Sequence, residues 1–170
     1  MSSSFRDYLE NWLRGFSKLV IMGIGNILKG DDALGPEFVS ELRGKLPKNV
    51  EVLDCGTVPE NFIGKIVWLK PSHVLLVDAA HFGGRPGEMI LIPSDHISGV
   101  ASSTHNVPLN ILAELIGKFS GAKVMLLGIE PKNLNLGDDM SPEIRESVKL
   151  GSRILIETIN SILEEEKSES

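Results

Sequence analysis

Acidic and imidazole side chains in this sequence could form a site for a divalent cation. Asp31 and Asp32 follow a short apolar run, Asp78 ends another apolar run, and His105 lies in a polar loop before a predicted helix. In open parallel sheets, ligands bind beyond the carboxyl ends of the strands, where the strand order reverses. We therefore expect these side chains to share one rim of a sheet, where carboxylates and an imidazole favour a cation. The residues alone do not separate Asp31 from Asp32, and we expect one of the two to cap a helix.

Asp78 is the strongest of these candidates because it interrupts an otherwise apolar strand. A buried carboxylate is costly unless it is paired, hydrogen-bonded or bound to metal. His105 is a candidate ligand only because the acidic residues are expected at the same rim. His81, which closely follows Asp78, is a reserve ligand, and Glu130, which ends a later strand, is a further candidate for the rim.

The loop that contains Gly23 and Gly25 invites comparison with the three-glycine fingerprint of dinucleotide-binding proteins. Leu28 stands where the third glycine would be. The two aspartates that follow add about two negative charges where a pyrophosphate would bind. Asp54, at the end of the next predicted strand, could imitate the acid that binds ribose, but the electrostatics favours a cation over a phosphate. We therefore predict no nucleotide cofactor.

Nucleophilic catalysis by serine or cysteine has little support in this chain. The sequence lacks the Gly-x-Ser-x-Gly elbow, and Cys55 follows Asp54, whose charge would raise the pKa of the thiol and weaken the thiolate. Cys55 is the single cysteine, which excludes an internal disulfide and any multi-cysteine metal site. This cysteine usage suits a reducing compartment, and we expect a cytoplasmic protein.

Composition limits the class of protein and its partners. The chain has 170 residues, 42% of them hydrophobic, which predicts one globular domain over residues 1–170 rather than a disordered chain. Aromatic residues make up only 5%, and the net charge is −6, so we expect no nucleic-acid partner. No apolar run is long enough for membrane insertion. Residues 164–170 predict an acidic, frayed tail.

Apolar periodicity predicts an α/β fold. Apolar residues at helical spacing predict a helix over residues 4–16, within an N-terminal extension over residues 1–18. Strands and helices then alternate along the chain, with strands expected over 19–24, 50–54, 73–79 and 123–129 and helices over 34–46, 59–69, 108–119 and 142–163. A glycine-rich turn leads into 89–92, which we expect to form a hairpin and an antiparallel edge strand. This order predicts a three-layer α/β/α sandwich around a mostly parallel sheet.

Several fragments together carry a family resemblance. Their order along the chain is Gly23-x-Gly25-Asn26-x-Leu28-x-x-Asp31-Asp32-x-x-Gly35, Val77-Asp78-Ala79-Ala80, Thr104-His105, Gly128-Ile129-Glu130-Pro131 and Ser141-Pro142-Glu143. The chain resembles the hydrogenase maturation endopeptidases from about residue 19 to residue 163. The segment 54–60, Asp-Cys-Gly-Thr-Val-Pro-Glu, resembles the branch that serves formate-linked hydrogenases.

This resemblance implies a substrate, a metal and roles for three residues. Members of the family remove a C-terminal extension from the large-subunit precursor of nickel-iron hydrogenases, and they recognise nickel already inserted in that precursor. The family's metal ligands fall on Asp32, Asp78 and His105, whereas Asp31 and Asn26 stay secondary candidates. The metal could polarise the scissile carbonyl or activate water, or Asp32 and Asp78 could act as acid and base.

A metal-dependent endopeptidase of hydrogenase maturation is therefore the predicted function, and we expect a monomer. The alternative is a non-proteolytic nickel carrier or chaperone module that uses the same three ligands. Cleavage of a nickel-loaded precursor separates the two hypotheses, because a carrier leaves the mass of the precursor unchanged.

Overall fold

A mostly parallel sheet forms the centre of the molecule. The computed structural model describes residues 2–102 and 106–169. The strands of the main sheet follow the order β2-β1-β3-β6-β4, with bounds β1 (Leu19–Ile24), β2 (Val50–Gly56), β3 (His73–His81), β4 (Met89–Pro93) and β6 (Lys123–Ile129). Only β4 runs antiparallel to its neighbour in that order. A short strand, β5 (Ala101–Ser102), which the sequence did not indicate, pairs antiparallel with the end of β3.

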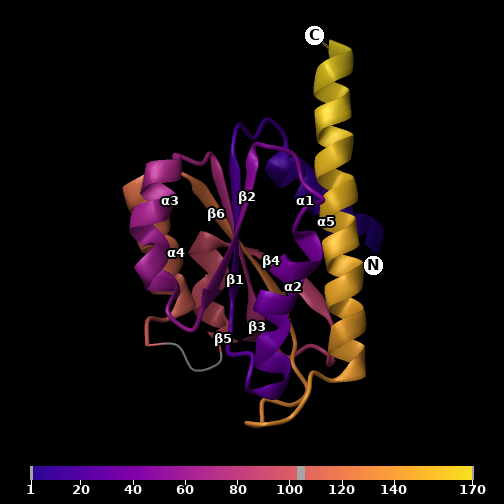
Figure 1. Cartoon of the computed structure of the whole chain (residues 1–170). Coiled ribbons are helices and arrows are strands. Elements are labelled where there is room, and N and C mark those ends of the chain that lie inside the picture. Colours follow the sequence, from indigo (N-terminus) through magenta and orange to yellow (C-terminus); the bar gives the residue numbers. More distant parts are fainter. Residues whose placement is uncertain (1, 103–105, 170) are drawn as a thin grey trace.

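Helices cover both faces of this sheet, which confirms the predicted three-layer sandwich (Figure 1). Helices α1 (Ser2–Leu13), α2 (Leu34–Leu42) and α5 (Pro142–Glu169) bury their apolar residues against one face. Helices α3 (Ile63–Leu69) and α4 (Leu109–Ser120) cover the other face. Three 3₁₀ helices complete the described elements: η1 (Gly30–Ala33), η2 (Pro59–Phe62) and η3 (Ser94–Gly99).

The central strands are apolar along their whole length because helices cover both of their sides. All six residues of β1 are buried, as are eight of the nine residues of β3. Successive side chains of a strand point to opposite faces, so Ile21 joins the core under α2 and α5, and Met22 joins the core under α3 and α4. This double burial explains why the sequence shows continuous apolar runs rather than alternation.

The edge strand β4 is antiparallel, as predicted, but the expected hairpin is wrong. β4 pairs with β6 and not with β3, because β6 forms a parallel ladder with β3 from His73 to Ala79 and occupies that side of it. The strand that follows the glycine-rich turn therefore lies outside β6. Backbone hydrogen bonds between Gly87 and Glu130 and between Glu130 and Glu88 extend the β4–β6 pairing.

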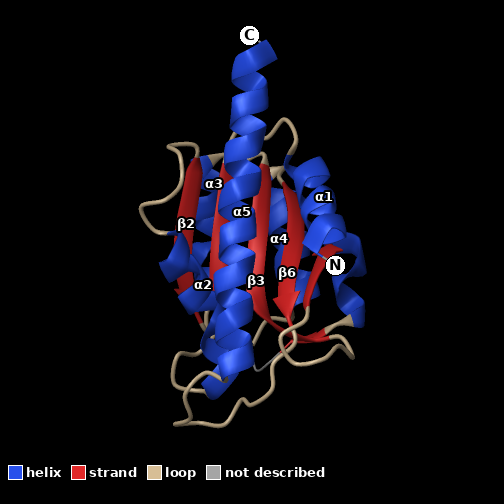
Figure 2. Ribbon diagram, turned by 90° about the vertical axis from the view of Figure 1, so that its right-hand side faces the viewer, coloured by secondary structure: helices blue, strands red, loops and turns tan. Residues whose placement is uncertain are grey.

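The two terminal helices lie against each other and differ in extent from the predicted ones. α1 ends at Leu13, three residues before the predicted end at residue 16, and Gly15 just after it has a positive φ of 79°. Residues 164–169, expected to fray, continue α5 to Glu169, and this end projects beyond the sheet (Figures 1 and 2). The Arg14 guanidinium lies 3.2 Å from the Glu165 carboxylate. Within the described residues, no helix combines the length and apolar character needed to cross a membrane.

Candidate functional site

The order of strands reverses between β1 and β3. From β1 the chain proceeds to β2 on one side, whereas from β3 it proceeds to β6 on the other side. The carboxyl ends of these strands lie at the lower end of the molecule in Figure 2, opposite the projecting end of α5. Asp78 lies near the end of β3, and Asp32 lies in η1, shortly after β1. Both aspartates therefore lie at the edge where ligands bind in such sheets.

Close packing of glycines holds η1 and α2 against the strand ends. A Cβ atom on Gly35 would lie 2.7 Å from the Val77 carbonyl oxygen, so only glycine allows α2 to approach the boundary between β1 and β3. A Cβ atom on Gly25 would overlap the Asp32 carbonyl oxygen, and Gly25 also has a positive φ of 150°. The glycines of this loop thus serve tight packing around Asp32.

The Asp32 carboxylate is fully buried and held by the loop after β1. The backbone N–H of Asn26 donates a hydrogen bond to Asp32 Oδ2 at 2.9 Å. The side-chain oxygen of Asn26 accepts a hydrogen bond from the backbone N–H of Leu28, also at 2.9 Å. Asn26 therefore fixes both the shape of the loop and the orientation of the carboxylate.

Asp78 is also fully buried, and its side chain points to the face of the sheet covered by α3 and α4. This orientation follows from strand alternation, since Leu76 and Ala80 on either side of it belong to the core of that face. Burial of two carboxylates at one strand boundary costs free energy that paired charges or hydrogen bonds must offset.

Asp31 has a different environment from Asp32. Its carboxylate accepts four hydrogen bonds, from the backbone N–H groups of Lys132, Asn133 and Ser141 at 2.9, 2.8 and 2.6 Å and from the Ser141 hydroxyl at 2.9 Å. All four donors belong to the segment between β6 and the start of α5. Asp31 therefore ties this distant loop to η1.

Neither aspartate acts as the expected helix cap. The residue before η1 is Lys29 and the residue before α2 is Ala33, and neither makes a side-chain capping hydrogen bond. The expectation of a capping aspartate is therefore wrong. The structural reason is that Asp31 bonds the β6–α5 loop and Asp32 bonds the loop after β1, in both cases outside the helix that follows.

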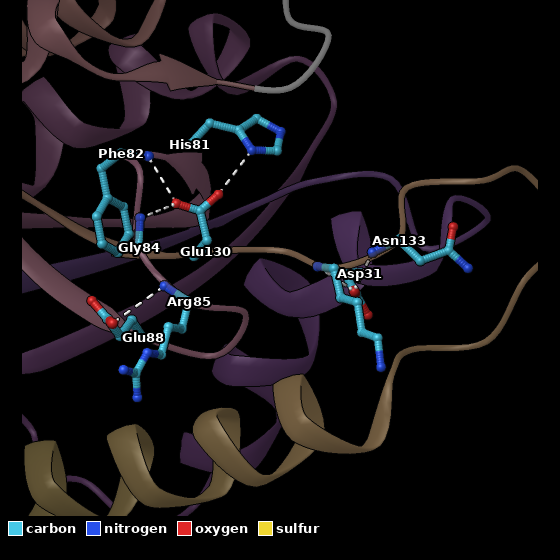
Figure 3. A network of polar contacts seen from close by, with 9 residues as sticks. Asp31, His81, Phe82, Gly84, Arg85, Glu88, Glu130 and Asn133 are labelled. Carbon is cyan, nitrogen blue, oxygen red and sulfur yellow. Dashed lines mark hydrogen bonds and ion pairs between the residues drawn. The ribbon is translucent and has the colours of Figure 1, made fainter.

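Glu130 and His81 form a pair at the same edge of the sheet (Figure 3). One oxygen of Glu130 accepts hydrogen bonds from the backbone N–H groups of Phe82 and Gly84 at 3.0 and 2.9 Å, and the other lies 2.9 Å from His81 Nδ1. Burial alone would raise the pKa of Glu130, but these hydrogen bonds outweigh burial and lower it.

This arrangement gives Glu130 a role that the sequence did not reveal. The carboxylate binds the backbone of the turn that leads from β3 towards β4, and it occupies one ring nitrogen of His81. The available signal was the Gly83-Gly84 turn, whose backbone N–H groups need an acceptor. Both residues stay secondary candidates for the rim.

The described residues contain no group of three or more His, Cys, Asp or Glu side chains arranged to hold a metal ion. His105, the third predicted ligand, lies outside the described residues. The predicted set of Asp32, Asp78 and His105 is therefore not tested by this geometry and stays a prediction.

Comparison with known proteins identifies the family. The sequence model of the HycI hydrogenase maturation protease family matches residues 36–162, about three quarters of the chain. The chain belongs to this family. It is a peptidase of [NiFe] hydrogenase maturation, as the resemblance predicted.

Solved structures of maturation proteases share this fold. The [NiFe] hydrogenase maturation protease HycI from Thermococcus kodakarensis KOD1 superposes with a TM-score of 0.83 at 36% identity, over 90% of this chain and 99% of that one. The endopeptidase HycI from Escherichia coli gives a TM-score of 0.71 at 33% identity, over 80% of this chain and 87% of that one. In sequence, the hydrogenase 3 maturation protease of Escherichia coli K12 is 35% identical over 131 residues, 76% of this chain and 83% of the relative.

The single cysteine of this maturation protease lies where its thiolate is disfavoured. Cys55 is buried in β2, and burial, together with the neighbouring charge of Asp54, raises the pKa of its thiol to about 12. At neutral pH the thiolate is therefore nearly absent. The contribution of Asp54 agrees with the sequence-based expectation that its charge raises the pKa of the thiol.

Proposed function

We propose that this maturation protease removes the C-terminal extension of a [NiFe] hydrogenase large-subunit precursor. In this proposal, nickel in the precursor is recognised by Asp32, Asp78 and His105. The observation that supports it is the burial of two carboxylates at the boundary between β1 and β3, in a chain that belongs to the hydrogenase maturation proteases.

The chemistry of the described donors fits a divalent metal. The loop N–H of Asn26 orients the Asp32 carboxylate, and Asp78 projects from the neighbouring strand, β3. Two carboxylates, completed by an imidazole, offer hard and borderline donors of the kind that bind nickel. The metal so held would supply Lewis acidity at the scissile carbonyl.

The chain's own residues then have two tasks. Asp32 and Asp78 recognise the metal in the precursor, and either carboxylate can also accept or return a proton during hydrolysis of the peptide bond. Three protein ligands leave coordination positions for ligands from the precursor. We therefore expect the protease alone to bind nickel weakly and the complex with the precursor to hold it tightly.

Cleavage of a precursor with and without nickel tests this proposal. The protease is incubated with the nickel-loaded and the nickel-free large subunit, and the product mass is measured by mass spectrometry. We expect loss of the C-terminal extension only from the nickel-loaded form. Equal cleavage of both forms would contradict nickel recognition, and an unchanged mass in both would favour the carrier hypothesis.

A further inference from the structure

Three large aliphatic side chains are exposed at the carboxyl edge of the sheet. Ile27 and Leu28, in the loop after β1, are 68% and 63% exposed, and Leu136, in the loop between β6 and α5, is 73% exposed. We call these three residues the aliphatic ridge. Exposed aliphatic groups at a functional edge, rather than scattered singly, are typical of a binding surface.

Hydrogen bonds between the two loops hold the aliphatic ridge in place. The backbone N–H of Gly137, in the same peptide unit as the Leu136 carbonyl, donates to the Leu28 carbonyl at 2.8 Å. A second bond joins Gly30 N–H to the Asp138 carbonyl at 3.1 Å. Because the backbone is already ordered on both sides, a ligand that binds here pays little entropy to order the surface.

The aliphatic ridge is directly connected to the proposed site. Asn26 donates its backbone N–H to Asp32 Oδ2 and accepts the backbone N–H of Leu28 at its side-chain oxygen. Asp31, next to Asp32, anchors the loop that carries Leu136 through its bonds to Lys132 and to Asn133, the second of which is labelled in Figure 3. Both aspartates are buried: Asp32 belongs to the proposed site, and Asp31 holds the loop of Leu136 beside it.

We infer that the aliphatic ridge seats an apolar, extended segment of the precursor next to the peptide bond that is cleaved. This inference rests on the proposed function, because the precursor is the polypeptide which that function brings to Asp32. A protease must bind the residues that flank the scissile bond. Carboxylates that bind metal offer no apolar surface, so they do not bind an aliphatic side chain. Ile27 and Leu28 lie within a few residues of Asp32 in the chain, and the hydrogen bond from Gly137 to Leu28 joins the loop of Leu136 to them.

The size of the aliphatic ridge favours a short segment over a second copy of the protease. Three such side chains bury roughly 200–350 Å² of apolar surface when covered. A stable protein–protein interface needs about 800 Å² per partner. The ridge by itself is therefore too small for a dimer contact, but it matches one or two aliphatic residues of a bound peptide.

Polar substitution of the aliphatic ridge tests the inference. We expect the triple variant Ile27→Ser, Leu28→Ser, Leu136→Ser to raise the KM for the nickel-loaded precursor by roughly 10- to 100-fold and to leave kcat within about twofold, since the ridge contributes uniform binding. The matched control is Trp68→Ser with Phe119→Ser, which removes exposed apolar side chains from α3 and α4. Far-UV circular dichroism and urea unfolding of each variant check the fold.

A binding measurement separates this inference from the proposed function. Titration calorimetry compares the protein with and without the ridge substitutions for affinity towards the nickel-free precursor, which the proposed function leaves uncleaved and which offers no metal to Asp78. Weaker binding only on loss of the ridge supports the inference even if no cleavage is seen. Equal affinity with and without the ridge, or no binding by the protein with an intact ridge, overturns it. A smaller mass of the triple variant in multi-angle light scattering also overturns it, because the ridge would then join two copies.

Discussion

The two ends of the sheet bury polar groups in different ways. At the amino end, Ser72 Oγ accepts the backbone N–H of Ser17 at 2.9 Å and lies 2.8 Å from His73 Nδ1, and the His73 ring meets the Trp12 ring edge to face, with centroids 4.9 Å apart. These groups are neutral when buried, and they join α1 to the sheet. The contacts explain how the N-terminal helix packs.

At the carboxyl end, the buried polar groups are carboxylates held by loops. Each of three carboxylates accepts backbone N–H groups from a segment outside its own helix or strand: Asp31, Asp32 and Glu130. A donor to Glu130 is 46 positions away in the chain, and a donor to Asp31 is 110 positions away. Backbone donors stabilise negative charge that the interior would otherwise disfavour. This fold therefore concentrates buried negative charge at the carboxyl end, where we propose that the metal binds, and buries neutral polar groups at the amino end.

The largest expected effect is the loss of cleavage on substitution at the carboxyl end. Asp78→Asn keeps the size of the side chain but removes its charge, and we expect precursor cleavage to fall by at least about 100-fold while the fold survives. The assay is the rate of product formation, with circular dichroism as the check on folding. The matched control, Asp54→Asn, makes the same change at the end of β2 and should cleave normally. An active Asp78→Asn protein would remove this residue from the site.

A loss of stability should distinguish Asp31 from its neighbour. Asp31→Ala removes one carboxylate that accepts four hydrogen bonds, and hydrogen bonds to charged groups contribute about 1.5–3 kcal/mol each. Water and loop relaxation recover part of this, so we expect the free energy of unfolding to fall by about 2–4 kcal/mol. Urea denaturation measures the change, with Asp54→Ala as the control. A change below about 0.5 kcal/mol would show that Asp31 does not anchor the β6–α5 loop.

Glu130 should make the carboxyl end sensitive to acid. Its folded pKa lies below the ordinary value of 4.5, so its contribution to stability is complete above that value and is lost as the pH falls through the folded pKa. Glu130→Gln should therefore reduce the drop in unfolding free energy between pH 5.5 and about pH 3. Chemical denaturation at both pH values measures this drop, and Glu146→Gln, on the exposed face of α5, is the control. An unchanged drop would exclude Glu130 as a source of acid sensitivity.

His73 should make the amino end sensitive at a higher pH, and with the smallest effect. Burial lowers the pKa of His73 below 6.5, so the folded protein favours the neutral ring, and stability is lost as the pH falls from about 6.5 through the folded pKa. We expect His73→Leu to reduce the loss of stability between pH 7.5 and pH 5 and to leave cleavage at pH 7.5 unchanged. His96→Leu, in an exposed position, is the control. Impaired cleavage at pH 7.5 by folded His73→Leu protein would contradict the view that the amino end of the sheet serves packing and takes no part in cleavage.

The architecture and the carboxyl edge of the sheet were predictable from sequence patterns alone. Strands buried on both faces must be apolar throughout, so the runs that became β1, β3 and β6 were visible without any partner. The rhythm of strands and helices then predicted the layers, the antiparallel edge strand and the carboxyl edge. Asp32 follows the apolar run of β1 and Asp78 lies near the end of the apolar run of β3, and strand direction alone brings their backbones to that edge.

Tertiary structure decided what depends on partners far away in the chain. Only the return of the β6–α5 loop makes Asp31 an anchor and distinguishes it from Asp32, because its hydrogen-bond donors lie about 100 residues away. The pairing of Glu130 with His81 and the insertion of β6 between β3 and β4 arise in the same way. Local patterns specify strands, helices and faces, whereas hydrogen bonds between distant loops form only when the layers pack together.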